Sequence, residues 1–254
     1  MAGNITTDAG FTPIVLTFDD GWQDNFNITK KENGQLAIDP DSAIGILENF
    51  NKNTPDFPLE ATFFINDDPF EQGELLGYKL NYIVDKGMDI GNHTLTHANF
   101  TSKEKNTIEK EIADIVRMVK EYLPDYEVNT LALPFGSRPK NKELEVYLEK
   151  GEFEGISYKN LAILNVGWDP YKSPFDKNFN PLSIHRIRAS DLQEYVKGVG
   201  MYDWLNRFEN GERIRFISDG DPKVVTIPEG YEEYINENKI NNKTVRSYEL
   251  SKFN

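Results

Sequence analysis

The sequence predicts an α/β fold in which crossover helices connect the strands of a parallel sheet. Short apolar runs of strand length alternate with segments whose apolar residues recur at helical spacing. The chain has 254 residues, which is enough for one sizeable core, and single domains of this length are common among α/β barrels. We therefore expect one domain over residues 1–254, with a polar C-terminal tail from about residue 231.

The first part of the chain shows this alternation clearly. Residues 14–18 form a compact apolar run that predicts a buried strand, and the polar residues 23–40 predict a long loop. A helix is expected to open at residues 39–41 and another to cover 75–86, where Gly87 stops it. Two further strands are expected, at residues 61–65 and 88–91.

The clearest helix comes next. Thr101 and Glu104 have the spacing of a capping box, apolar residues then recur on one face as far as Val119, and Pro124 marks the end. Beyond it we expect strands at 130–133, 161–166 and 182–187, helices near 140–150 and over 190–208, and a hairpin that pairs 213–217 with 223–227.

Composition excludes several classes of function. Asp plus Glu number 42 against 28 Lys plus Arg, so the formal net charge is -14 and a nucleic acid partner is not expected. There is no cysteine, which removes disulfides, thiolate nucleophiles and Cys-based zinc sites. No apolar run is long enough to span a membrane. A neutral or partly cationic glycan is electrostatically acceptable.

Two histidines and two aspartates form the most informative pattern. The chain has three histidines, His93, His97 and His185, and the first two are four residues apart. On a helical turn this spacing places both imidazoles on one side. His93 follows one predicted strand and Asp19 and Asp20 follow another, at the sheet edge where α/β sites lie.

Each half of this pattern has a simpler explanation when taken alone. A His pair at this spacing occurs by chance on solvated helices, and Asp19-Asp20-Gly21 is also a plain turn sequence. Adjacent carboxylates after an apolar run are costly without a partner, and a cation is such a partner. Two imidazoles and one carboxylate suit zinc and related divalent metals and leave a position for water.

These residues resemble the first two motifs of the polysaccharide deacetylases, the NodB homology domain of carbohydrate esterase family four. The matching segments are Thr17–Gly21 (TFDDG) and His93–His97 (HTLTH), about seventy residues apart, and Ala61–Phe64 resembles the second strand of the family. The resemblance extends from Ile14 to at least Ile187. It implies a distorted (β/α) barrel with its site at the carboxyl ends of the strands.

The resemblance also implies roles for single residues. Asp20, His93 and His97 are expected to hold a divalent metal, with zinc expected and cobalt or nickel able to substitute. Asp19 is expected to be the general base. The backbone N–H of Phe135 is expected to help stabilise the oxyanion.

The third family motif is met only in part. Pro134, Phe135 and Gly136 match it, but Ala132 stands where the family has an arginine that steadies the base. This departure leaves the pKa and orientation of Asp19 open. Three other arginines are candidates to take the place of the family arginine, namely Arg138, Arg186 and Arg188. The alternative for each is an ordinary surface residue.

The last two motifs are matched loosely. Trp168-Asp169 resembles the fourth motif, although Trp168 is equally explained as a core residue. His185 is the candidate for the catalytic acid, yet Ser183 takes the place of an apolar residue, and a strand histidine without a special role is the alternative. Residues 184–188 resemble the version of this region in surface-anchored deacetylases of Gram-positive bacteria.

The expected function is metal-dependent hydrolysis of N-acetyl groups on hexosamine residues of a cell-wall or surface polysaccharide, peptidoglycan or chitin-like. One alternative is a catalytically weak, metal-containing glycan-binding surface protein, and another is an O-acetyl esterase with the same site. The first residues show no signal peptide. We expect an extracellular or cell-surface location, with the export signal or anchor absent from this sequence, while the oligomeric state stays open.

Overall fold

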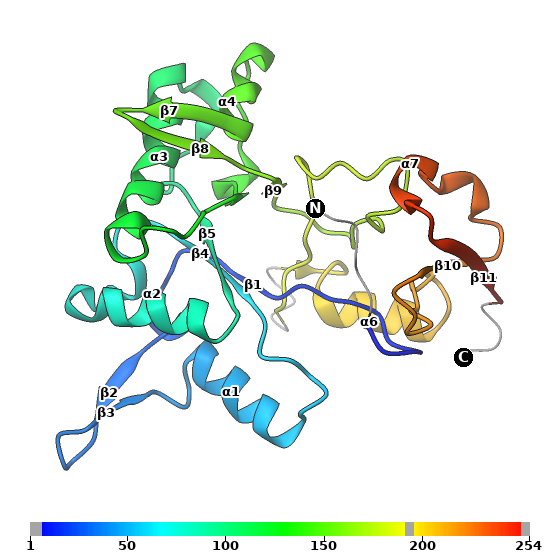
Figure 1. Ribbon diagram of the computed structural model, residues 1–254, viewed down its shortest axis with the longest axis horizontal. Helices are drawn as coiled ribbons and strands as arrows, with labels where there is room; N and C mark the ends of the chain where they lie inside the picture. The colour runs from blue at the N-terminus through cyan, green and yellow to red at the C-terminus, as the bar shows by residue number, and fades with distance from the viewer. Residues whose placement is uncertain (1–6, 191–195, 250–254) are drawn as a thin grey trace. The chain divides into compact units, whose positions relative to one another are not determined.

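The computed structural model describes residues 7–190 and 196–249 (Figure 1). Contacts divide the chain into two compact units, each with its own sheet. We call Val15–Asn165 the sheet unit, and we call Met1–Ile14 together with Val166–Asn254 the C-terminal unit. The expectation of one domain over residues 1–254 stays a prediction.

The sheet unit is built on a parallel five-stranded sheet with the order β1-β4-β5-β6-β9. Its strands are β1 (Thr17–Phe18), β4 (Thr62–Ile65), β5 (Asp89–Asn92), β6 (Thr130–Ala132) and β9 (Ala162–Leu164). Its α-helices are α1 (Ala43–Asn53), α2 (Leu76–Asp85), α3 (Lys105–Tyr122) and α4 (Val146–Glu149). The parallel sheet curls into half a barrel, so the predicted α/β fold of the distorted (β/α) barrel type is confirmed.

Short 3-10 turns complete the connections of the sheet unit. They are η1 (Gln23–Asn25), η2 (Pro69–Glu71), η3 (Gly73–Leu75), η4 (Phe100–Ser102), η5 (Pro134–Gly136) and η6 (Lys142–Glu145). Three of them, η2, η4 and η5, follow the carboxyl ends of β4, β5 and β6. The residues between strand and helix at this edge are therefore fixed by tight turns.

Apolar periodicity explains the strands and helices that the sequence predicted well. Three consecutive residues of β4, Phe63–Ile65, are buried, as expected for a strand covered on both faces. On α3 the buried side chains include the apolar residues expected on one face, namely Ile108, Ile112, Ile115, Val116 and Val119. The expected capping box is wrong, because Thr101 lies in η4 and Glu104 precedes α3 without a side-chain cap.

The first expected strand is shorter than the apolar run that predicted it. Ile14 and Val15 are exposed, and β1 contains only Thr17 and Phe18. The reason is that pairing with β4 begins at Thr17, which lies opposite Thr62. Residues before this point lie outside the sheet, whatever their hydrophobicity.

Residues 23–40 are not one long loop. They contain η1 and an antiparallel hairpin of β2 (Ile28–Lys30) and β3 (Leu36–Ile38) (Figure 1). Gly34 has a φ of +81°, a conformation that glycine adopts without strain. The Asn33-Gly34 pair is a typical hairpin signal, which the polar composition of the segment concealed.

The helix expected near residues 140–150 is only partly present. The four-residue α4 ends at Glu149, and β7 (Lys150–Phe153) then pairs with β8 (Ile156–Lys159) in an antiparallel hairpin. Glu154 and Gly155 have φ values of 48° and 80°, as the turn of a two-residue hairpin requires. This hairpin packs beside α3 (Figure 1).

The C-terminal unit has its own elements and a small core. They are α6 (Met201–Glu209), β10 (Val224–Pro228), η7 (Glu232–Tyr234), α7 (Glu237–Ile240) and β11 (Thr244–Tyr248). Its core contains Phe175, Val225 and Ile227, and the half-buried Phe216 and Ile235 pack against it. The tail that was expected to be merely polar from about residue 231 thus supplies a strand and two helical turns.

Two expectations for this unit are wrong, and a third is met only in part. The hairpin of 213–217 with 223–227 is absent, because β10 pairs in parallel with β11, while Ser218 exchanges backbone hydrogen bonds with Gly10 and Phe11. Residues 182–187 form no strand, and a turn closed from Ser183 N–H to Asn180 O occupies the start of this segment.

The helix expected over 190–208 is present only in part among the described residues. Part of that range, 191–195, lies outside the described residues, and α6 starts only at Met201. Gly198, with a φ of +73°, interrupts the helical pattern just before it.

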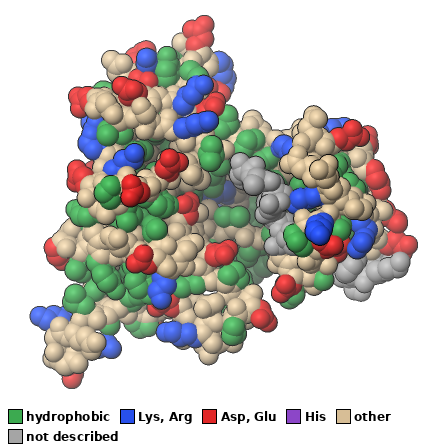
Figure 2. All heavy atoms as spheres, viewed as in Figure 1, with side chains coloured by type: hydrophobic (Ala, Val, Ile, Leu, Met, Phe, Trp, Pro, Cys, Tyr) green, Lys and Arg blue, Asp and Glu red, His purple; other side chains and the backbone are tan. Residues whose placement is uncertain are grey.

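Figure 2 shows acidic and basic side chains scattered over the visible face. Among the described helices, none combines the length and apolar character that a membrane crossing requires.

Candidate functional site

Asp20 lies in a strained turn directly after β1. Asp20 and Gly21 have φ values of 71° and 63°, and the Gly21 carbonyl accepts a hydrogen bond from Phe70 N–H at the start of η2. Left-handed backbone is uncommon for residues other than glycine and is held only where neighbours fix it. Trp22 Nε1–H donates to Asp20 Oδ2 at 3.1 Å. One carboxylate oxygen of Asp20 is therefore anchored by Trp22, and the other faces the histidines.

His93 and His97 lie on a tight loop after β5. The sequence argument placed them on a helical turn, but Thr94 and His97 have φ values of 63° and 51° and the segment is not helical. The loop still brings the imidazoles together, with ring centroids 5.0 Å apart. Their shared face arises from the loop backbone rather than from helical spacing.

Buried polar contacts hold this loop. Asn92 Oδ1 accepts from Thr94 N–H at 2.8 Å, and Thr94 Oγ1 accepts from Ala98 N–H at 2.8 Å. The Glu111 carboxylate accepts from both the N–H and the hydroxyl of Thr96, at 2.8 and 2.7 Å. Glu111 is buried on α3, so the helix itself fixes the segment between the two histidines.

The orientation of His93 follows from a backbone contact. His93 is buried, and its Nδ1 lies 2.8 Å from the carbonyl oxygen of Ala132, the last residue of β6. A carbonyl can only accept, so Nδ1 carries the proton. The lone pair of Nε2 then points to the Asp20 side, which is the arrangement that metal-ligating histidines adopt.

Three donor atoms converge at this place. Asp20 Oδ1 lies 3.3 Å from His93 Nε2 and 3.3 Å from His97 Nε2, and the three ligand atoms lie within 4.8 Å of one another. Ligand atoms about 2.1 Å from a tetrahedral ion are roughly 3.4 Å apart. The residues therefore fit a zinc-like divalent cation, and the donor set of two imidazoles and one carboxylate suits it.

The charge state of Asp20 also fits this use. The adjacent His93 ring is the largest cause that lowers the pKa of the Asp20 carboxyl, and burial opposes the effect. The carboxylate is thus ionised at neutral pH, as a metal ligand must be.

Asp19 lies beside the three donors but farther from them. Its Oδ2 is 4.0 Å from His93 Nε2. This position keeps its carboxylate near the reacting region without making it one of the converging donors. The role of general base stays a prediction.

The third motif places Phe135 against His97. Phe135 has a φ of 57° and its ring meets the His97 ring edge to face, with centroids 4.6 Å apart. Within the described part of the chain, the Phe135 N–H has no acceptor. An unpaired N–H beside the donors is what the predicted oxyanion role needs.

Ala132 is fully buried in β6 and contributes only its carbonyl to the site. Of the possible substitute arginines, Arg138 donates from Nε and Nη2 to Asn165 Oδ1, and burial lowers the pKa of its guanidinium. Arg186 and Arg188 belong to the C-terminal unit. Which arginine steadies Asp19 stays open.

His185 belongs to the C-terminal unit, where it pairs with Asp169. His185 Nδ1 lies 3.0 Å from Asp169 Oδ1, and its ring contacts that of Tyr171 at 5.3 Å between centroids. A Cβ at Gly167 would lie 2.7 Å from Arg186 O, so the glycine allows the two segments to approach closely. The sequence argument treated Asp169 only as a motif neighbour of Trp168 and missed its pairing with His185.

Trp22 and Glu111 were also missed. Trp22 directly follows the Asp-Asp-Gly motif, so its position in the chain was a usable signal. Glu111 lies three residues after Ile108 and one before Ile112, at the border of the apolar face of α3. An acidic side chain at such a position needs a buried partner, and this was the signal that could have found it.

Comparison with known proteins gives the family to which the chain belongs. Residues 7–151 match the family described as polysaccharide deacetylase. The search of curated proteins found no match. Among solved structures, the Streptococcus pyogenes deacetylase PplD in complex with acetate is similar, with 18% identity and a TM-score of 0.50 over 76% of this chain and 68% of that chain.

Two structures from Bacillus anthracis have lower scores. A family 4 carbohydrate esterase is 19% identical, with a TM-score of 0.40 over 83% of each chain. A CE4 family pseudoenzyme is 22% identical, with a TM-score of 0.35 over 51% of this chain and 37% of that chain. The match of residues 7–151 covers more than half of the sequence, and the chain belongs to the polysaccharide deacetylase family.

Proposed function

We propose that this protein is a metal-dependent hydrolase that removes N-acetyl groups from hexosamine residues of a surface polysaccharide. The observation that carries this proposal is the convergence of Asp20 Oδ1 with the Nε2 atoms of His93 and His97. Family membership gives the class of chemistry, deacetylation of a polysaccharide. Zinc is the proposed metal, because the donor set consists of imidazoles and one carboxylate.

The residues of the sheet unit supply most of the proposed chemistry. Asp20, His93 and His97 would hold the cation, which when bound polarises the acetyl carbonyl and lowers the pKa of water. Asp19 takes the proton from the attacking water as general base. The backbone N–H of Phe135 donates to the acetyl oxygen as negative charge develops on it.

The leaving amine needs a proton, and His185 is the proposed donor. The Asp169 carboxylate fixes the imidazole through Nδ1, so that Nε2 is the atom that delivers the proton. The reaction yields free amine on the sugar and acetate. We place this activity at the outside of the cell, on peptidoglycan or a chitin-like polymer.

A second candidate is a metal-containing glycan-binding protein with weak catalysis. The observation that favours it is Ala132, which gives the site no arginine at the family position. Poor orientation of a catalytic group lowers the rate strongly even when binding is intact. This candidate predicts metal and glycan binding with little acetate release.

An acetyl-substrate panel tests the proposal and separates N- from O-deacetylation. Zinc-loaded protein is incubated with N-acetylated chitooligosaccharides, N-acetylated peptidoglycan fragments and O-acetylated xylooligosaccharides, and acetate and free amine are quantified. We expect acetate together with an equal amount of amine from an N-acetylated substrate. Acetate from the O-acetylated substrate alone would make the protein an esterase, and release that is unchanged in His93→Ala would exclude this site as its source.

A further inference from the structure

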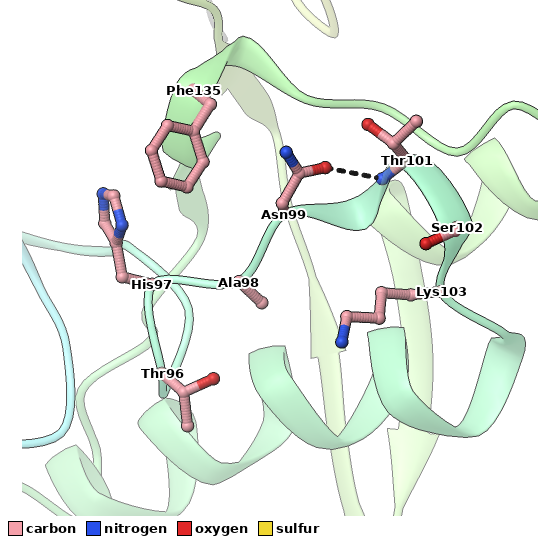
Figure 3. A pocket seen from close by; sticks show the side chains of 8 residues that line it. All are labelled: Thr96, His97, Ala98, Asn99, Thr101, Ser102, Lys103 and Phe135. Carbon is pink, nitrogen blue, oxygen red and sulfur yellow. Dashed lines mark hydrogen bonds between the residues drawn. The ribbon is translucent and has the colours of Figure 1, made fainter.

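A pocket of about 610 Å³ opens beside His97 in the sheet unit (Figure 3). Phe135 and His97 lie on one side of it, and Thr101, Ser102 and Lys103 lie on the other. Its volume is within the about 300–1,000 Å³ that is typical of ligand pockets. Because the pocket shares His97 and Phe135 with the metal centre, a chain of sugars could occupy both.

The charge of this pocket differs from that of the chain. The protein has a net charge of -14, yet no carboxylate lines the pocket, and Lys103 contributes a full positive charge. Figure 3 shows the Lys103 amino group extending toward the side of Thr96 and Ala98. Lys103 is thus the one charged lysine or arginine that the pocket lining contains, and it is exposed to solvent.

The Lys103 ammonium is not committed to another side chain. Among the described residues it has neither an ion pair nor a hydrogen-bond acceptor. By contrast, Lys105 and Lys110 on α3 each lie near a carboxylate, those of Glu109 and Asp114. An exposed ammonium at the rim of a pocket, without a partner among the described residues, is available to pair with an anionic ligand.

Neutral donors complete the pocket. Asn99 Oδ1 accepts from Thr101 N–H at 3.0 Å, which orients the Asn99 side chain. Within the described part of the chain, neither Asn99 Nδ2 nor the Ser102 hydroxyl has a hydrogen-bond partner. Phe135 is 65% exposed, so its ring offers an apolar surface to the face of a sugar. Hydroxyls and a carboxylate of one saccharide would satisfy this combination.

We propose that this pocket is a subsite for a sugar that bears a carboxylate, adjacent to the N-acetylhexosamine that is deacetylated. Lys103 pairs with the carboxylate, while Asn99 and Ser102 bind hydroxyls. The inference rests on the proposed function for the identity of the neighbouring sugar. It names the substrate class as an acidic hexosamine glycan, in which the carboxylate comes from a lactyl ether or from a uronic acid.

Direct binding measurements test the subsite without depending on turnover. Calorimetry measures Kd for three tetrasaccharides: neutral chitotetraose, a tetrasaccharide that alternates N-acetylglucosamine with N-acetylmuramic acid, and a hyaluronan tetrasaccharide that contains glucuronate. The proteins are wild type, Lys103→Gln, Lys103→Arg and Lys120→Gln. Lys120 is an exposed lysine in the last turn of α3, outside the pocket, so its substitution changes the net charge equally.

We expect wild type to prefer at least one acidic tetrasaccharide over the neutral one by about tenfold, the value of one charge-assisted hydrogen bond. Lys103→Gln should abolish this preference, while Lys103→Arg and Lys120→Gln should keep it. Preference for the muramic acid probe alone identifies the lactyl carboxylate as the source, and preference for the hyaluronan probe alone identifies the uronate.

Three results overturn the subsite: no binding of any probe, equal affinity for acidic and neutral probes, or a preference that survives Lys103→Gln. The fate of the proposed function is read separately, from acetate release. A preference that depends on Lys103 without acetate release removes the catalysis and keeps the subsite. Acetate release without such a preference removes the subsite and keeps the proposed deacetylase activity.

Discussion

Asp19 and Asp20 are neighbours in the chain but face the histidines differently. Asp20 Oδ1 lies 3.3 Å from both Nε2 atoms, whereas the distance from Asp19 Oδ2 to His93 Nε2 is 4.0 Å. Trp22 holds the outer oxygen of Asp20, and β1 ends at Phe18 just before the pair. This asymmetry is the basis for assigning ligation to Asp20 and proton transfer to Asp19.

Asp19→Asn should retain the metal and lose most activity. The amide is nearly isosteric with the carboxylate but cannot take a proton, and loss of general-base help costs about 10²–10⁴-fold in rate. The measurement is kcat for acetate release together with zinc content after dialysis. Unchanged kcat would show that another group is the base, and loss of zinc along with activity would make Asp19 a ligand.

A buried carboxylate on α3 is the clearest link between a helix and the site. Glu111 accepts two hydrogen bonds from Thr96, which lies between the two histidines in the loop. Contacts of this kind around metal ligands typically change metal affinity by about 10–100-fold. Glu109, also buried on α3, instead lies near Glu152 N–H and Lys105 on the side of the β7–β8 hairpin.

Glu111→Ala should therefore weaken zinc binding by about 10–100-fold. Glu111→Gln should restore part of the affinity, because its amide oxygen still accepts from Thr96 N–H. Glu109→Ala is the matched control, since it also removes a buried carboxylate from α3 but leaves the loop contacts intact. Equal weakening of zinc binding by the two alanine substitutions would mean that α3 acts through general stability rather than through Thr96.

On α2, Lys79 supports the turn that contacts the Asp20 loop. The side chain is fully buried, and Nζ donates to the carbonyl of Phe70 at 3.0 Å, between the rings of Phe26 and Phe70. Phe70 in turn donates its N–H to Gly21. Burial is the largest cause that lowers the pKa of Lys79, to about 8.

This pKa predicts a stability that rises with pH. Below about pH 8 both folded and unfolded chains hold the proton, and the cost of the buried charge is constant. Between about pH 8 and 10.5, the ordinary pKa of a lysine, the unfolded chain binds more protons, so the free energy of unfolding increases. The full increase is up to about 3 kcal/mol.

Urea unfolding of wild type and Lys79→Met at pH 7, 9 and 10 measures this effect. The methionine side chain keeps the apolar packing and does not titrate, so the difference between the two proteins isolates Lys79. We expect wild type to gain stability relative to the variant as the pH rises. A difference that is constant over this range would show that Lys79 keeps an ordinary pKa.

The elements that the sequence predicted well are those whose apolar pattern is local. β4 and α3 have a continuous apolar run and a helical stripe, and the structure contains both. Elements that depend on distant partners were predicted poorly. β10 pairs with β11, which follows it by about sixteen residues and runs parallel to it, whereas the sequence favoured a nearby antiparallel partner.

The same distinction applies to the site. His93, His97, Asp19 and Asp20 were found because short motifs contain them, and the structure brings the three expected ligands together. The support from Glu111 depends on how α3 docks on the loop, and no local pattern encodes that contact. The helical explanation of the His pair was wrong. Its conclusion, that the two imidazoles lie on one side, nevertheless agrees with the structure.

At the scale of the whole molecule, the two units contribute different groups. The three candidate ligands, Asp19 and Phe135 all belong to the sheet unit, whereas His185 and Asp169 belong to the C-terminal unit. The proposed metal site therefore draws on residues of the sheet unit alone.

The third histidine provides an internal control for the metal. His93→Ala removes one of the three converging donors, while His185→Ala removes an imidazole that pairs with Asp169 instead. Zinc content after dialysis should fall in the first variant and stay near that of wild type in the second. Both variants should release less acetate than wild type, for different reasons.

Acetate release with and without chelation tests the central claim most directly. Wild type is freed of metal with a chelator, assayed on an N-acetylated hexosamine oligosaccharide, and assayed again after zinc is added back. We predict that release is lost on chelation and restored by zinc in wild type, and that zinc restores nothing in His93→Ala. Acetate release that continues in the chelated protein, or that zinc restores equally in His93→Ala, would contradict a metal-dependent deacetylase built on Asp20, His93 and His97.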